Sequence, residues 1–310
     1  MAISNSRRIG IPMVNLGLGG GGGGASFLLD DYPNIGGHSY SLRQLSSTVN
    51  SVVRVRRASD NTEQDFTAAQ ITNGMLATFC GSSEGFVAKW YDQSGNKDVY
   101  NFTALQQPKI FAEDGLGGHE VLLENGKPCV EFDGGDDSLQ VLLTAPFNSN
   151  YYLFAVNTWV SAPAEGDGYM YGLRSLGPVY PSGDDASNSI SWNGTIGTMT
   201  GSGILTLPPV TPLTWIQNGS FPQSLYYARQ VAPSLPGTGS QLKINTNQHP
   251  IIGGTPNGTA QVSAIHLGEN GAGQGNSNIR LQEFILYFND PGVSATAIES
   301  NINTHYSIYL

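Results

Sequence analysis

The chain has 310 residues, only 12% of them charged, and a formal net charge of −10 at pH 7. A negative chain repels the phosphate backbone at long range, which excludes nucleic acid as a main partner and disfavours basic attachment to a membrane surface. No apolar run approaches the roughly 20 residues that a membrane-spanning helix needs, so membrane insertion is not expected. The 39% of hydrophobic residues and the 40 glycines instead indicate cored β-sheets joined by many tight turns.

The N-terminal segment divides into an apolar arm and a glycine-rich hinge. Residues 19–24 are six consecutive glycines, a run whose ordering costs too much conformational entropy. Residues 1–18 are too apolar for a solvated tail, while their glycines and proline argue against a secretory signal peptide. They fit either a disordered tail or a docking peptide that orders against a partner protein. We predict an anchoring arm (1–18), a hinge (19–30) and one domain (31–310).

Strand-like segments follow the hinge without an obvious linker. Several of them alternate apolar and polar residues, and turn sequences such as "QSGN", "DGGDD" and "WNGT" separate them. The segments are residues 51–57, 85–91, 128–134, 151–160, 213–218, 224–231, 260–268 and 281–288. So many strands without alternating helices predict an all-β fold, an antiparallel sandwich.

Few helices are expected. Residues 39–49 fit a short helix, and Asn73 can cap a helical turn that a following glycine closes. Near the end of the chain, Ile298, Ile302 and Tyr306 fall at i, i+4 and i+8, on one face of a helix. We predict that this C-terminal helix packs its apolar face on the sandwich.

The densest group of cations lies in "RVRRASDNTEQDF", residues 54–66. A grip on a polyanion is a weak explanation in a chain of net charge −10. The strand period places Arg54 and Arg56 on one face and Arg57 on the other. We predict an internal network of salt bridges and hydrogen bonds that pins a loop to the sandwich. The expected acidic partners are Asp60, Glu63 and Asp65.

Several motifs carry a resemblance to known proteins. "SYSLRQL", "RVRRASDNTEQDF", "FCGSSEGFVAKWYDQSGN" and "GKPCVEFDGGDDSL" resemble the catalytic-domain family of α-L-arabinofuranosidase B. The chain also resembles concanavalin A-like, laminin-G-like domains of bacteriophage virion proteins, most closely in "LQEFILYFNDPGVSATAIESNINTHYSIYL" at the C-terminus. The resemblance covers most of residues 38–310. It implies a jelly-roll β-sandwich, in agreement with the strand pattern.

The arabinofuranosidase resemblance implies two catalytic carboxylates, a nucleophile and an acid/base, about 5 Å apart. Where the family has its nucleophile, "YMYGLRSLG" supplies Leu173, Arg174 and Ser175, and where it has its acid/base, "AIHLGENGAGQG" supplies Ala272. Both carboxylates are therefore missing, and their loss removes nearly all activity. An active enzyme would need displaced carboxylates, for which the candidates are Glu269, Glu165 and Glu283.

Two further stretches are candidate binding sites. Trp90, Asp92 and Gln93 in "WYDQSGN" offer a ring on which a sugar can stack and two side chains for its hydroxyls. The same residues are also typical of turns, so the alternative is that their polar side chains hydrogen-bond the backbone where a strand ends. In "FDGGDDSL", the acidic residues can supply oxygens to Ca²⁺ or form a solvated turn. These three residues are Asp133, Asp136 and Asp137.

No other cofactor is predicted. The five histidines lack metal-ligand spacing, and the glycine run lacks the Lys-Ser/Thr of a phosphate-binding loop. Cys80 and Cys129 are too few for a disulfide scaffold. We expect two buried thiols, although a single bridge also fits the sequence.

These features favour a non-enzymatic bacteriophage virion protein, such as a head fibre, a head decoration or a tail fibre. Residues 1–18 would bind other virion proteins, and the lectin-like sandwich would project outward and adhere weakly to a host surface glycan. Fibres and decorations are commonly symmetric, which favours a homo-oligomer. The alternatives are an arabinofuranosidase-type glycoside hydrolase and a free-standing lectin.

Overall fold

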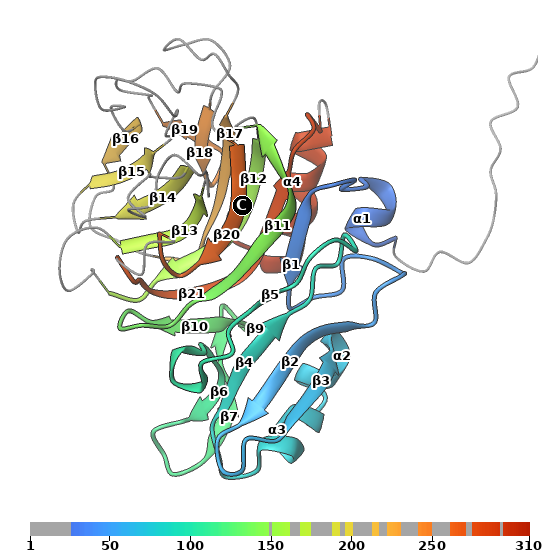
Figure 1. The fold of residues 1–310 in the computed structure, drawn as a ribbon, viewed down its shortest axis with the longest axis vertical. Helices are drawn as coiled ribbons and strands as arrows, with labels where there is room; N and C mark the ends of the chain where they lie inside the picture. Colours follow the sequence, from blue (N-terminus) through green and yellow to red (C-terminus); the bar gives the residue numbers. More distant parts are fainter. Residues whose placement is uncertain are drawn as a thin grey trace, which may run out of the picture.

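An antiparallel β-sandwich with short helices outside it forms the described part of the computed structural model (Figure 1). The strand pairings among the described residues are all antiparallel, which confirms the predicted fold class. The predicted arm, residues 1–18, lies outside the described residues. The structure describes residues 26–148, 151–161, 168–174, 188–192, 196–200, 213–216, 222–230, 241–249, 261–270, 275–291 and 294–310.

One layer of the sandwich is built around β20 (Gln261–Leu267). β20 pairs with β11 (Leu139–Asn148) and with β13 (Gly168–Arg174). The layer continues from β13 through three short strands in sequence order. These are β14 (Asn188–Trp192), β15 (Ile196–Thr200) and β16 (Leu213–Ile216).

The second layer is centred on β12 (Tyr151–Trp159) and β21 (Asn278–Tyr287), which pair along most of their lengths. β12 also pairs with β17 (Ser224–Gln230). β21 continues the layer to two strands from the first half of the chain. These are β1 (His38–Ser41) and β10 (Val130–Asp133). Beyond β17 lie β18 (Gln241–Ile244) and β19 (Asn247–His249).

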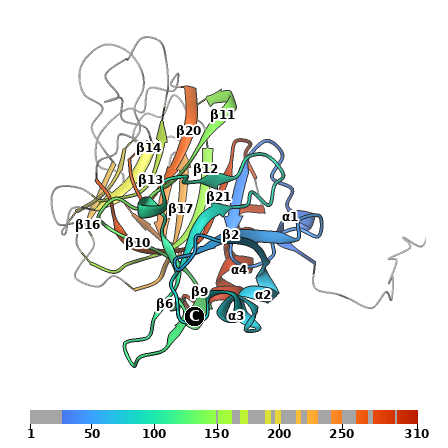
Figure 2. The same cartoon turned by 60° about the horizontal axis from the view of Figure 1, so that its bottom comes forward.

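A smaller sheet joins the two layers, because its β5 pairs with β11 and its β6 with β10. Its strands are β2 (Ser51–Arg57), β3 (Glu63–Thr67), β4 (Gly85–Trp90), β5 (Val99–Tyr100), β6 (Lys109–Glu113) and β7 (His119–Val121). Figures 1 and 2 show two short helices beside this sheet. They are α2 (Ala68–Thr72) and α3 (Met75–Cys80). The remaining short elements are η1 (Ala104–Gln106), β8 (Leu123–Glu124) and β9 (Lys127–Pro128).

β12 is buried on both faces, which explains its almost continuous apolar run "YYLFAVNTW". Its odd-numbered side chains belong to the core between the layers, and its even-numbered ones to a second core under α1 (Leu28–Asp31) and α4 (Ser294–Tyr306). The inter-layer group is Tyr151, Leu153 and Ala155, and the helix-facing group is Tyr152, Phe154 and Val156. The predicted face of α4 is confirmed, since Ile298, Ile302 and Tyr306 lie in the second core.

Two predictions about local structure are wrong. Residues 39–49 do not form a helix, because residues 38–41 form β1, in which Tyr40 lies opposite Phe284 of β21. The hinge does not extend to residue 30, because α1 begins at Leu28 and buries Leu28 and Leu29 in the second core. The predicted helical turn forms as α3, but its N-cap is Gly74 rather than Asn73, whose Oδ1 accepts the Met75 N–H at 3.1 Å from one position earlier.

Both cysteines are buried free thiols, as one of the two alternatives predicted. Burial raises the pKa of the Cys80 thiol to about 11, so the thiol stays protonated at neutral pH. In the described part of the chain, no helix combines the length and apolar character that crossing a membrane requires.

Candidate functional site

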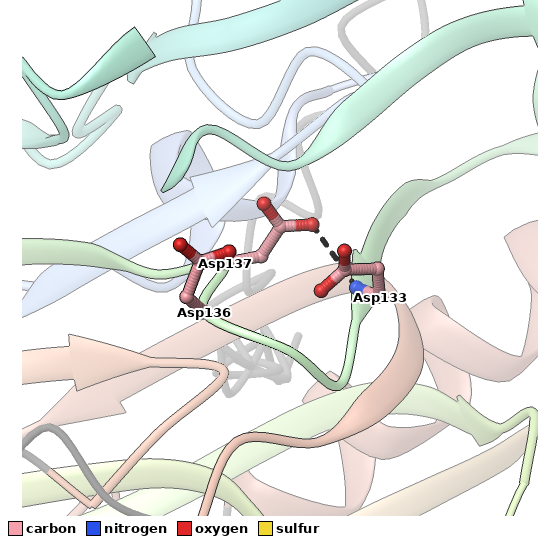
Figure 3. Close-up of side chains that lie close together, drawn as sticks. All are labelled: Asp133, Asp136 and Asp137. Atoms are coloured by element: carbon pink, nitrogen blue, oxygen red, sulfur yellow. Dashed lines mark hydrogen bonds between the residues drawn. The ribbon is translucent and has the colours of Figure 1, made fainter. Parts of the chain in front are cut away.

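Three aspartates of one tight turn gather at the end of β10 (Figure 3). One carboxylate oxygen from each of Asp133, Asp136 and Asp137 lies within 4.8 Å of the other two. Gly134 makes the turn with a φ of 79°, and a Cβ at this position would lie 3.0 Å from the backbone nitrogen of Asn278. The turn therefore places the predicted calcium candidates together, and its tightness depends on glycine.

The three carboxyl groups differ in their surroundings. Asp137 is 5% exposed, whereas Asp133 and Asp136 are exposed. Asp137 Oδ2 accepts the backbone N–H of Asp133 at 3.0 Å, and Asp133 Oδ1 accepts that of Gly135 at 2.7 Å. Burial, followed by the charge of Asp133, raises the pKa of Asp137 to about 7. A carboxyl group that ionises near neutrality thus lies beside two further carboxylates.

This donor set suits a hard cation better than it suits glycoside hydrolysis. Ca²⁺ takes about six to eight oxygen ligands, and the cluster of Asp133, Asp136 and Asp137 can supply part of such a set. A retaining glycosidase instead needs carboxylates that flank the scissile bond. All three aspartates come from a single five-residue turn, and Figure 3 shows their carboxylates close together. The solvated-turn alternative fits Asp133 and Asp136 but does not fit the buried Asp137.

Asp137→Asn is expected to stabilise the protein at pH 8 and to change its stability little at pH 4. The folded state keeps the Asp137 proton up to a pKa of about 7, whereas the unfolded chain loses it near about 4. The folded state therefore binds more protons in this window, and the free energy of unfolding falls as pH rises from about 4 to 7. Because asparagine does not ionise, Asp137→Asn should reduce this decrease in the free energy of unfolding by on the order of 2–4 kcal/mol.

Urea denaturation of the wild type and of Asp137→Asn at pH 4 and at pH 8 measures this difference in stability. Asp136→Asn is the matched control, since it removes a carboxylate of the same turn from an exposed position. It should reduce the pH dependence less than Asp137→Asn does. Equal slopes of stability against pH in Asp137→Asn and the wild type would contradict the assignment to Asp137.

The predicted sugar site at Trp90, Asp92 and Gln93 is wrong, because these residues are 0%, 4% and 2% exposed. No ring face of Trp90 is available for stacking. Asp92 serves the strand end instead: its Oδ2 lies 2.6 Å from His38 Nδ1, and its Oδ1 accepts the Ser39 N–H at 2.9 Å. The structure thus agrees with the turn interpretation of Asp92.

Gln93 is also engaged internally. Its Oε1 accepts the Leu45 N–H at 2.6 Å, and its Nε2 donates to the carbonyls of Ser41 and Arg43 at 3.0 and 2.9 Å. These bonds hold the segment after β1 against the end of β4. The side chain therefore organises the backbone and leaves no amide group for a ligand.

Glu283, a candidate for a displaced catalytic carboxylate, is 0% exposed. Its two oxygens accept from Arg43 Nε and Nη2 at 2.7 and 2.9 Å. Ser41 Oγ and the Tyr306 hydroxyl donate to the same carboxylate at 2.7 and 3.2 Å. Glu283 joins β21, the segment after β1 and α4, and a substrate cannot reach it in this arrangement.

Glu269, the second candidate, is 7% exposed, and its Oε1 lies 3.1 Å from His266 Nδ1. The third candidate, Glu165, lies outside the described residues. Leu173, one of the three residues that the sequence resemblance places where the nucleophile would be, is fully buried in β13. Ala272, which the sequence resemblance places where the acid/base would be, lies outside the described residues. The described candidates for catalysis, Glu269 and Glu283, therefore face internal partners.

The predicted arginine network forms in part. Arg54 binds Asp65 through Nε and Nη2 at 2.6 and 3.0 Å, and Arg57 binds Asp60 through the same two nitrogens at 3.0 and 2.6 Å. Arg57 Nη1 also donates to the carbonyl of Phe79 at 2.7 Å, which pins the end of α3 to β2. These two pairs form as predicted, but both are partly exposed rather than internal.

The rest of the network differs from the prediction. Glu63 comes no closer than 4.0 Å to Arg54. Arg56 binds neutral partners rather than a carboxylate, among them Gln107 at 2.6 Å. Local spacing could indicate the pairs within one hairpin. Local spacing could not indicate Gln107, because this residue lies 51 positions from Arg56 in the sequence.

No family model matches the chain, and no curated protein matches it. Similar solved structures include a mutant GH54 α-L-arabinofuranosidase soaked with 4-nitrophenyl α-L-arabinofuranoside, at 16% identity and a TM-score of 0.53, covering 91% of this chain and 65% of that one. A GH54 α-L-arabinofuranosidase soaked with a cyclic sulfate inhibitor has 14% identity, a TM-score of 0.52 and coverages of 88% and 63%. Trypanosoma rangeli sialidase has 13% identity, a TM-score of 0.46 and coverages of 71% and 31%.

The chain thus spans less than two thirds of the length of each of these structures. At these identities, the likeness to the arabinofuranosidases concerns the fold alone. The resemblance to them inferred from the sequence motifs is confirmed at that level. The chain folds into a β-sandwich that glycoside hydrolases also use.

Proposed function

We propose that this protein is a non-enzymatic structural protein of a bacteriophage particle, displayed as a head fibre, head decoration or tail fibre. One observation carries the non-enzymatic part of the proposal. Glu283 and Glu269, the described carboxylates available to replace the missing catalytic pair, are buried against Arg43 and His266. Glu283 is 0% exposed and Glu269 is 7% exposed, so a substrate would reach either carboxylate only if the elements around it moved apart.

The bacteriophage part rests on the sequence resemblance and on the arrangement of arm, hinge and sandwich. The segment that carries the closest resemblance, residues 281–310, supplies most of β21 and all of α4, which hold the second layer together. The hinge ends at α1, where the Leu29 N–H donates to the carbonyl of Leu45 at 2.8 Å. A force that acts on the arm would therefore be transmitted through α1 to the second core. We propose that the arm binds a neighbouring virion protein and that copies of this chain associate symmetrically.

Deleting residues 1–24 is expected to abolish incorporation into particles while the sandwich remains folded. The deletion stops before Leu28 and Leu29, so it removes no residue of the described core. Incorporation is measured by immunoblotting of purified particles, and folding by circular dichroism. A control in which serines replace alternate glycines of residues 19–24 keeps the arm and its reach, and should still be incorporated. Unchanged incorporation of the deletion variant would rule out anchoring through the arm.

An assay with an aryl arabinofuranoside tests the enzymatic alternative. We expect no turnover above background. Turnover that Glu269→Gln abolishes would overturn the non-enzymatic proposal and favour an arabinofuranosidase with displaced carboxylates. Asp136→Asn serves as a control that removes an exposed carboxylate elsewhere.

A further inference from the structure

A cavity of about 270 Å³ opens beside the last turn of α4. Its wall comes from segments far apart in the sequence: the stretch after β1, helix α2, the β8–β9 hairpin and the end of α4. The polar residues that line it are Arg43, Gln44, Thr72, Lys127, His305 and Tyr306. The tertiary fold alone creates this cavity, since no two of the four segments are neighbours in sequence.

The lining is basic in a chain that is strongly acidic. The cavity has three residues with basic side chains and no Asp or Glu, although the chain has 24 Asp and Glu against 14 Lys and Arg. Arg43 is neutralised from behind by Glu283 at 2.7 Å. The net positive charge of the lining therefore comes from Lys127.

Lys127 differs from the lysines that the fold uses for ion pairs. Lys89, Lys109 and Lys243 each have a carboxylate oxygen at 2.8–3.3 Å. Among the residues that the structure describes, Lys127 has no such partner. Its ammonium group is thus available to an anion in the cavity.

The lowered pKa of His305 agrees with a positive electrostatic potential in this cavity. Burial and the charges of Arg43 and Lys127 lower the pKa of His305 to about 4, against the opposing effect of Glu283. The remaining titratable neighbour, Tyr306, packs edge-on against the His305 ring at a centroid distance of 4.6 Å. The imidazole is therefore neutral at pH 7 and offers one N–H donor to a ligand.

We propose that this cavity binds a small hydroxylated carboxylate with the size and chemistry of one sugar acid. The carboxylate would pair with Lys127, and the side-chain oxygens of Gln44 and Thr72 would accept from the hydroxyls, because Gln44 Nε2 and the Thr72 hydroxyl already donate to backbone carbonyls at 2.9 and 3.4 Å. Leu42 and Pro128 supply apolar contacts to the ring. The volume lies just below the roughly 300–1,000 Å³ of pockets for drug-sized ligands, which limits the ligand to about one ring. The site stands whether or not the protein is part of a particle.

The test is titration of the full chain with sodium glucuronate, followed by NMR of the His305 ring, whose signals are assigned with His305→Gln. Glucuronate should shift these signals saturably and raise the titration midpoint of His305, because a bound carboxylate offsets Lys127. Glucose, which lacks the charge, should do neither. The absence of a saturable shift with glucuronate, or an equal response to glucose, would overturn the proposal. Tighter binding of inorganic phosphate would also overturn it, since phosphate has no sugar ring to contact Leu42 and Pro128.

Variants of Lys127 give a second readout by isothermal titration calorimetry. Lys127→Gln should weaken glucuronate binding at least about tenfold, and Lys127→Arg should largely restore it. Lys97→Gln is the matched control, since it removes the same charge from a loop that does not line the cavity. Lys127 belongs to no ion pair of the described fold, so its variants should fold, which circular dichroism verifies. Unchanged binding in a folded Lys127→Gln would overturn the proposal.

Discussion

Replacing Arg43 with methionine is expected to lower the free energy of unfolding by about 3–5 kcal/mol, measured by urea denaturation. The substitution leaves the carboxylate of Glu283 at 0% exposure without the two N–H donors that hold it at 2.7 and 2.9 Å. The hydroxyls of Ser41 and Tyr306 still donate to Glu283, but they cannot balance its charge. An unpaired buried charge is among the most costly defects that a fold can carry.

The double variant Arg43→Met with Glu283→Gln is the control for this interpretation. It removes both charges, so no buried carboxylate remains uncompensated. We expect it to recover part of the stability lost in Arg43→Met. A double variant that is less stable than the single one would show that the loss comes from packing of Arg43 rather than from the stranded charge.

Arg56→Ala is expected to cost about 3 kcal/mol, because it removes three hydrogen bonds of a buried charged group. Arg56 is 8% exposed and donates to Gln107 Oε1, Asn61 Oδ1 and the Ala104 carbonyl at 2.6, 3.0 and 2.8 Å. Its guanidinium also lies 4.7 Å from the centroid of the Phe86 ring. Burial lowers the pKa of Arg56, since no carboxylate pairs with it closely. Its loss would leave neutral acceptors unsatisfied and release η1 from β2.

Arg54→Ala provides the matched comparison, because Arg54 lies two positions earlier on the same strand. Its side chain is 38% exposed and pairs with Asp65, whose side chain is also 38% exposed. Exposed pairs contribute about 0–1 kcal/mol, so the loss should be far smaller than in Arg56→Ala. A register shift between Arg54 and Val55 in the pairing with β4 separates the two environments. Equal losses in the two variants would contradict the assignment of Arg56 as the buried scaffold residue.

The strands could be predicted where the local pattern carried the information. Each of the eight predicted segments overlaps a strand, and the segment 51–57 coincides with β2. β1 was missed because its four residues are all buried, so no alternation marks them. Its stability comes from pairing with β21 and from the carboxylate of Asp92, which receives the Ser39 N–H. A helix at 39–49 satisfied the local composition but could not satisfy these distant partners.

The candidate site could likewise be predicted only in part from the sequence. The cluster of Asp133, Asp136 and Asp137 was visible in the sequence because one turn holds all three residues. The burial of Asp137, which raises its pKa to about 7, was not visible. The pairing of Asp92 with His38 also escaped prediction, since the two residues lie 54 positions apart. The local sequence indicated polar groups at these places, but it did not indicate which of them are exposed to solvent.

The sequence by itself determined the all-β class, the turns and the apolar face of α4, because strand and helix periods and turn residues are properties of neighbouring positions. Only the tertiary structure decided which charged groups are free. Arg43 and Glu283 lie 240 positions apart, yet folding buries them as a pair, while Lys127 is left facing a cavity. Burial and the field at a side chain depend on all the elements packed around it, and the chain acquires these surroundings only when its two layers close.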